Sequence, residues 1–162
     1  MIFRITQKLA RKIKVVPVTA LPPHDNPLLD WTANLFMVSR WQCILMTNSR
    51  SLYSVVLPGK GVPNELAFVE QSMKALVNCL MRDGIIGLYE AEIAPAIDSV
   101  SFCKAGDRRV LGSMNELIFQ AKVDILHIGH PLQLVNYNLN RTLLSLLNGR
   151  HPIEALVALA DR

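Results

Sequence analysis

The chain has 162 residues, of which 51% are hydrophobic and 19% charged, and its formal net charge is +4. This length suits a single domain covering residues 1–162, and so large an apolar share excludes an intrinsically disordered chain. The sequence contains no run of about 18 apolar residues, which excludes a membrane-spanning helix, and no membrane partner is expected.

The first predicted elements precede a proline-rich loop. Residues 2–5 predict a short edge strand, and Thr6 follows as the N-cap of a helix that runs to about Ile13. Leu9 and Ile13 are expected to face inward. The loop at 15–27 carries four prolines and little regular pattern, so it either covers a sheet edge or is mobile.

Three strand-like runs follow, at residues 34–38, 41–47 and 52–57, and short polar segments typical of turns join them. Sequential strands with such links predict an antiparallel meander. Apolar residues occur on both faces of the middle run, so we expect that strand to be central and covered on both sides. A further strand is expected at 99–104.

Helices are predicted in most of the remaining sequence. The clearest one starts after Asn64 and ends near Asp83, with Gly84 as its stop signal. Three more are expected at residues 114–126, 131–147 and 153–160. We therefore predict an α+β fold: an antiparallel meander sheet of about four strands with packed helices and a helical C-terminal layer. The last two helices are broadly apolar, which indicates deep burial or contact with a second copy, and we expect a homo-oligomer.

Residues 107–117 combine two arginines, a glycine and a capping-box pattern at a predicted helix start. Ser113 and Glu116 have the S-x-x-E spacing in which each side chain accepts a hydrogen bond from a backbone N–H group of the first turn. A helix start beside cations also suits an anion, but this capping satisfies part of the same N–H groups, so the cap is the favoured interpretation. The candidate anion- or ligand-binding residues are Arg108, Arg109, Ser113, Asn115, Trp31 and Asn34.

Positive charge is concentrated near the N-terminus, since residues 1–24 contain five basic residues and no acidic one. The candidate polyanion-contact residues are Arg4, Lys8, Arg11, Lys12 and Lys14. A solvated helix face is the simpler interpretation of the same residues. No aromatic residue beyond Phe3 is interleaved with them, so stacking on the bases of a single strand is not indicated.

The cysteines indicate the cellular compartment of the protein, and the histidines indicate whether it binds a metal. Cys43, Cys79 and Cys103 stand apart in apolar surroundings, and an odd number leaves no complete disulfide framework. No signal-peptide pattern is visible, so we expect a cytoplasmic protein. His127 and His130 have the spacing of metal ligands but no third ligand nearby, and no glycine-rich phosphate loop is present. We therefore expect neither a metal nor a cofactor.

Several landmarks resemble those of an uncharacterised bacterial protein family with W-x-A-N-L and V-L-G-S-M-N-[DE]-L segments. The matching segments are Asp30–Leu35, the strand pair that ends at Thr47 and Asn48, Arg109–Leu117, and Pro152–Leu156. The resemblance implies a small cytoplasmic protein of bacterial or mobile-element origin, and it implies no activity.

Three functional hypotheses follow. The leading one is a non-enzymatic cytoplasmic binding or interaction module that self-associates, because no catalytic constellation accompanies the surplus of apolar helix surface. The first alternative is a nucleic-acid- or nucleotide-binding accessory protein that uses the basic N-terminal segment with Arg108 and Arg109. The second alternative is an enzyme with an unrecognised site near Trp31, Asn34, Arg109 and Asn115.

Overall fold

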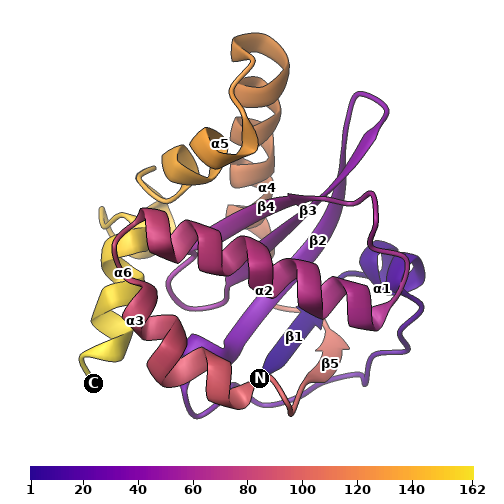
Figure 1. Cartoon of the computed structure of the whole chain (residues 1–162), viewed down its shortest axis with the longest axis vertical. Helices are drawn as coiled ribbons and strands as arrows, with labels where there is room; N and C mark the ends of the chain where they lie inside the picture. Colours follow the sequence, from indigo (N-terminus) through magenta and orange to yellow (C-terminus); the bar gives the residue numbers. More distant parts are fainter.

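A five-stranded sheet runs through the centre of the protein, in a computed structural model that describes residues 1–162 (Figure 1). The strands are β1 (Ile2–Ile5), β2 (Asp30–Val38), β3 (Trp41–Asn48), β4 (Ser54–Pro58) and β5 (Ser101–Lys104). Their order across the sheet is β4-β3-β2-β1-β5. With the helices described below, this arrangement confirms the α+β class.

The sheet is mixed, which corrects the prediction of an antiparallel meander of about four strands. β2, β3 and β4 do form an antiparallel meander, but β1 pairs in parallel with both β2 and β5. β1 is therefore an inner strand and not the predicted edge strand. Between β1 and β2 the chain forms α1 (Gln7–Ile13) and the proline-rich loop. This connection is long enough to return the chain to the starting end of the sheet, as parallel pairing requires.

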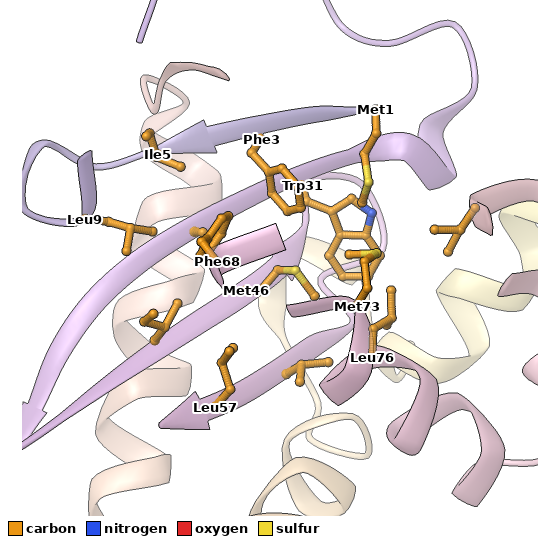
Figure 2. Packing of buried hydrophobic residues seen from close by; sticks show 14 of the residues in the cluster. Met1, Phe3, Ile5, Leu9, Trp31, Met46, Leu57, Phe68, Met73 and Leu76 are labelled. Carbon is orange, nitrogen blue, oxygen red and sulfur yellow. The ribbon is translucent and has the colours of Figure 1, made fainter. Parts of the chain in front are cut away.

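The sheet separates two hydrophobic cores, and side-chain alternation along β3 shows the division. Ile44 and Met46 point into the first core, which is packed against α2 (Glu65–Arg82) and contains residues of α1 (Figure 2). Cys43 and Leu45 point into the second core, which is packed against α4 (Arg108–Val123) and α5 (Leu132–Leu139). All four side chains are buried, so the prediction of a central strand covered on both faces is confirmed.

Local signals account for several helix boundaries. α2 begins after Asn64, whose Oδ1 accepts a hydrogen bond from the N–H group of Ala67 at 2.9 Å, and α2 ends at Arg82, close to the predicted end. α6 (Pro152–Ala160) begins one residue before the predicted 153–160 range, with its proline at the first helical position. Between α2 and β5 lie α3 (Ile86–Leu88), the π-helical turn η2 (Tyr89–Ile93) and the 3-10 turn η3 (Ala94–Ala96).

The start of α4 differs from the prediction. The helix begins at Arg108, and its N-cap is Asp107. The Oδ1 atom of Asp107 accepts hydrogen bonds from the N–H groups of Arg109 at 2.9 Å and Val110 at 3.3 Å. Ser113 is buried within the helix, so the predicted capping box at Ser113 is wrong.

An unbroken apolar face explains why α4 continues through Gly112. Val110, Met114 and Leu117 recur at helical spacing and are buried in the second core. Their burial outweighs the penalty of roughly 1 kcal/mol for a glycine inside a helix. The chain then continues into the π-helical turn η4 (Asp124–Ile128).

The predicted helix at 131–147 is shorter than expected. α5 ends at Leu139, and a separate 3-10 turn, η5 (Ser145–Leu147), follows. At the end of α5, the side chains of Asn136 and Asn140 hydrogen-bond to the backbone of β4. Contact with the sheet edge, rather than helical pattern alone, therefore determines how this segment is arranged.

The proline-rich loop covers the outer edge of β5. The N–H group of Val18 donates to the Phe102 carbonyl at 3.1 Å, and the N–H group of Lys104 donates to the Val18 carbonyl at 2.9 Å. Of the two outcomes considered for this loop, edge coverage is the one observed. None of the helices combines the length and apolar character needed to cross a membrane.

Candidate functional site

A pocket of about 570 Å³ lies on the α4 side of the sheet, over β1 and β2. We call it the polar pocket, because most of its lining residues have polar or charged side chains. These polar lining residues are Arg4, Thr19, Asp30, Thr32, Ser49, Arg50, Lys104, Asp107 and Arg109. They come from three strands, the proline-rich loop, the β3–β4 turn and the start of α4, so the pocket exists only in the folded chain.

An ion pair between Arg4 and Asp30 holds one wall of the polar pocket. Nε of Arg4 donates to Oδ1 of Asp30 at 2.7 Å, and a second guanidinium nitrogen donates to Oδ2 at 2.8 Å. The same guanidinium also donates to the carbonyls of Leu21 and Pro22, both at 3.0 Å. Arg4 therefore ties the proline-rich loop to the sheet and has its donors directed at protein partners.

The electrostatics of this pair keep Asp30 charged. Only 5% of the Asp30 side chain is exposed, and this burial acts to raise the pKa of the carboxyl. Hydrogen bonds from Arg4 and from the N–H group of His24 outweigh burial, so the pKa of Asp30 is lowered. The pKa of Arg4 is raised, chiefly by its hydrogen bond to Asp30. The charges of Arg4 and Asp30 thus neutralise each other.

The β3–β4 turn presents Arg50 to the polar pocket, and Asn48 organises this turn. The side chain of Asn48 is fully buried, and its Oδ1 accepts from the N–H groups of Arg50 at 3.1 Å and Ser51 at 2.9 Å. Its Nδ2 donates to the Pro27 carbonyl at 2.9 Å. These hydrogen bonds from the Asn48 side chain fix the backbone of the turn that carries Arg50.

Positive charge in the polar pocket exceeds negative charge. The lining includes four basic residues, Arg4, Arg50, Lys104 and Arg109, against the carboxylates of Asp30 and Asp107. Arg4 and Asp30 neutralise each other, while the side chains of the other three basic residues form no hydrogen bond or ion pair within the protein. Two neighbouring hydroxyls, of Thr32 and Ser49, hydrogen-bond to each other at 2.9 Å.

One of the residues predicted from the 107–117 segment lines the polar pocket. Arg109 does so, whereas Arg108 and Asn115 are exposed on α4 outside the lining. Ser113 is buried on the inner side of α4.

Trp31 and Asn34 lie away from the polar pocket. Trp31 is fully buried in the first core, on the opposite side of the sheet, and its indole N–H donates to the Leu28 carbonyl at 2.8 Å (Figure 2). Asn34 accepts a hydrogen bond from the Thr6 hydroxyl at 2.8 Å. The structure therefore does not bring Trp31, Asn34, Arg109 and Asn115 into one site.

The five N-terminal cations do not form one surface either. Arg4 points to Asp30, and Lys12 donates to Oε1 of Gln42 at 2.8 Å. Lys8 is exposed on α1 and lines none of the larger pockets. Arg11 and Lys14 line a second pocket beside α1.

Arg50 and Lys104 are pocket residues that sequence reasoning missed. Arg50 belongs to a segment whose composition indicates only a turn, so its sequence context carries no signal of a binding role. Lys104 ends a short strand. No spacing in the sequence relates Arg50 to Lys104 and Arg109, because the order of the strands brings them together.

Comparison with known proteins identifies the family and no function. No curated protein and no solved structure matches the chain. A family model described as a domain of unknown function, DUF6933, matches residues 2–155. This match agrees with the predicted resemblance to an uncharacterised family. The chain therefore belongs to the DUF6933 family of domains of unknown function.

Proposed function

We propose that this protein is a binding module that holds a small anionic group, a phosphate or a carboxylate, in the polar pocket. The observation that carries the proposal is the presence of two guanidinium groups without protein partners, on Arg50 and Arg109, in the lining of one pocket. Guanidinium groups bind carboxylates and phosphates through paired hydrogen bonds.

The rest of the lining refines this chemistry. The N–H groups of Arg109 and Val110 already bind Asp107, so the arginine side chains, and not the start of α4, supply the donors. The hydroxyls of Thr32 and Ser49 offer further hydrogen bonds. No aromatic residue lines the pocket, which favours recognition of an anionic group over stacking on a base.

Binding is favoured over covalent chemistry because the nearest thiol is not activated. Cys103 is fully buried next to Arg4, with its sulfur 3.5 Å from a guanidinium nitrogen. Burial raises the pKa of Cys103 more than Arg4 lowers it, so the thiolate form is disfavoured.

Calorimetric titration with inorganic phosphate tests the proposal, with a short single-stranded oligonucleotide as a second probe. We expect Arg50→Gln and Arg109→Gln each to weaken phosphate binding about tenfold, since a hydrogen bond to a charged group contributes about 1.5 kcal/mol. Arg108→Gln is the matched control, because Arg108 is exposed on the same helix outside the pocket. Absence of binding, or equal weakening by Arg108→Gln, would contradict the proposal.

The oligonucleotide separates a general anion site from the nucleic-acid-binding alternative. Affinity for the oligonucleotide that far exceeds affinity for phosphate, and that falls steeply with added salt, would favour the nucleic-acid alternative. Similar affinities for both probes would favour a site for a single anionic group.

Self-association is a second candidate function, supported by exposed apolar side chains on α4 and on the segment that follows α5. Phe119 is 71% exposed and Leu143 is 64% exposed, and the hydrogen bond from Thr142 to Gln120 holds their two segments together. A second copy of the chain would bury this surface. Light scattering should show a dimer that Phe119→Ser dissociates, and a strict monomer at high concentration would contradict this candidate.

A cytoplasmic location completes the proposal. It is supported by the three cysteines, all free thiols, of which Cys43 and Cys103 are buried. Reduced thiols are the usual state in a reducing compartment. Fractionation of the producing cells tests this location. Recovery of the protein in a membrane or secreted fraction would contradict it.

A further inference from the structure

The neighbouring parallel strands β1 and β5 send their following helices to opposite faces of the sheet. α1 follows β1, and its Leu9 and Ile13 are buried in the first core. α4 follows β5, and its Val110 and Met114 are buried in the second core. In open sheets with helices on both faces, ligands bind in the crevice outside the carboxyl ends of two such strands.

A second pocket, of about 560 Å³, lies in this crevice, and we call it the switch pocket. Ile5, the last residue of β1, and Lys104, the last residue of β5, both line it, together with Gln7 and Ala105 just beyond the strand ends. Lys104 also lines the polar pocket, and it is the only residue common to the two linings. The switch pocket is therefore adjacent to the polar pocket but built from a different set of residues.

The lining of the switch pocket is part cationic and part apolar. Arg11, Lys14 and Lys104 supply three positive charges, no acidic residue is present, and none of the three side chains has a protein partner. The backbone of Lys14 is held in place, because its N–H group, at the end of α1, bonds to the Ala10 and Arg11 carbonyls.

Apolar side chains form another part of the lining, and two of them, Ile5 and Ala10, also belong to the first core. Ile5, Ala10, Val15, Val16 and Pro17 form this part of the lining. Val16 is 96% exposed, although apolar side chains of its kind are among those most often buried in proteins. An apolar ligand body would cover this surface.

We infer that the switch pocket binds an organic anion, with an apolar body against the aliphatic wall and a carboxylate or phosphate beside Arg11 and Lys14. Small-molecule sites commonly combine an apolar lining with a few charged or polar groups. This site is separate from the proposed function of the polar pocket, since Arg50 and Arg109 do not contribute to it.

Decanoate and decanol test the inference, because they share an alkyl chain and differ in the charged head group. We expect decanoate to shift the backbone NMR signals of Ile5, Val16 and Ala105, and decanol to bind at least about tenfold more weakly. Equal binding of the two probes, or no binding of decanoate, would overturn the inference. Decanoate shifts confined to the exposed apolar residues Phe119 and Leu143 would overturn it as well.

Charge variants locate the site. Arg11→Gln and Lys14→Gln should each weaken decanoate binding about two- to fivefold, as expected for removing one partly solvated charge. Lys8→Gln is the matched control on the same helix and should leave the affinity unchanged, because Lys8 does not line the pocket. Weakening by Arg50→Gln or Arg109→Gln instead would place decanoate in the polar pocket and overturn the inference. Loss of phosphate binding in those two variants bears only on the proposed function.

Discussion

The side-chain amide of Asn140 pairs with both backbone groups of Ser54. Its Oδ1 accepts from the Ser54 N–H group at 2.7 Å, and its Nδ2 donates to the Ser54 carbonyl at 2.8 Å. Asn136 forms the same pair with Val56, at 2.7 and 3.2 Å. Four residues of helix rise about 6 Å, and two residues of strand rise about 6.8 Å, so the two amides match alternate residues of β4. α5 thereby occupies the place of a sixth strand at the sheet edge.

Replacing either asparagine should destabilise the protein strongly. Asn140→Ala leaves the buried N–H and C=O groups of Ser54 without partners, and unpaired groups of this kind cost about 1–3 kcal/mol each. We expect Asn140→Ala and Asn136→Ala each to lower the free energy of unfolding by about 2–4 kcal/mol in urea denaturation. Asn115→Ala, at an exposed position of α4, should change it by less than about 0.5 kcal/mol. An unchanged urea midpoint for Asn140→Ala would show that the pairing does not stabilise the edge.

Loss of Arg4 should destabilise the protein through Asp30. Arg4→Met leaves a nearly buried carboxylate without its guanidinium and should lower the free energy of unfolding by about 3 kcal/mol. The double variant Arg4→Met/Asp30→Leu should recover part of this loss, because it removes both charges. Lys8→Met serves as an exposed control on α1. If the double variant were less stable than Arg4→Met alone, an unpaired Asp30 could not be the cause.

The same ion pair predicts a pH dependence. The pKa of Asp30 is lower in the folded protein than its ordinary value of about 3.9. The pair therefore contributes fully above about pH 4, and its contribution is lost as the pH falls through the lower, folded pKa. In Arg4→Met the strongest hydrogen bonds to Asp30 are absent, burial raises its pKa, and its contribution should change sign. Urea denaturation of both proteins from pH 3 to pH 7 measures the difference, and parallel curves would refute it.

Thiol reactivity provides an independent check on burial. Burial raises the pKa of Cys79 to about 12, and burial also raises the pKa values of Cys43 and Cys103. Because the thiolate is the reactive form, all three cysteines should react slowly with a disulfide reagent at pH 8 in the native protein. In urea, the same assay should detect three fast thiols. If any one of the three cysteines reacted fast in the native protein, that result would contradict the placement of that residue in the structure.

Local pattern alone predicted the elements whose signals lie within a few residues. Strand-like apolar runs and short polar links were enough for the β2–β4 meander, and Asn64 was enough for the start of α2. Within 107–117, the sequence predicted a cap at Ser113, but the helix is capped by Asp107. Asp107 prevailed because Val110 joins the apolar face that α4 buries, and the sequence does not show which face is buried.

The parallel pairing of β1 could not be predicted from the sequence. The two candidate pockets could not be predicted either, because they arise only in the folded chain. Four residues of β1 carry no information on pairing direction, and only its place between β2 and β5 creates the crevice behind Ile5 and Lys104. Trp31 and Thr32 are neighbours in sequence, yet one lies in the first core and the other lines the polar pocket. The reason is that consecutive strand residues point to opposite faces, so a site on a sheet follows from strand order and parity rather than from proximity along the chain.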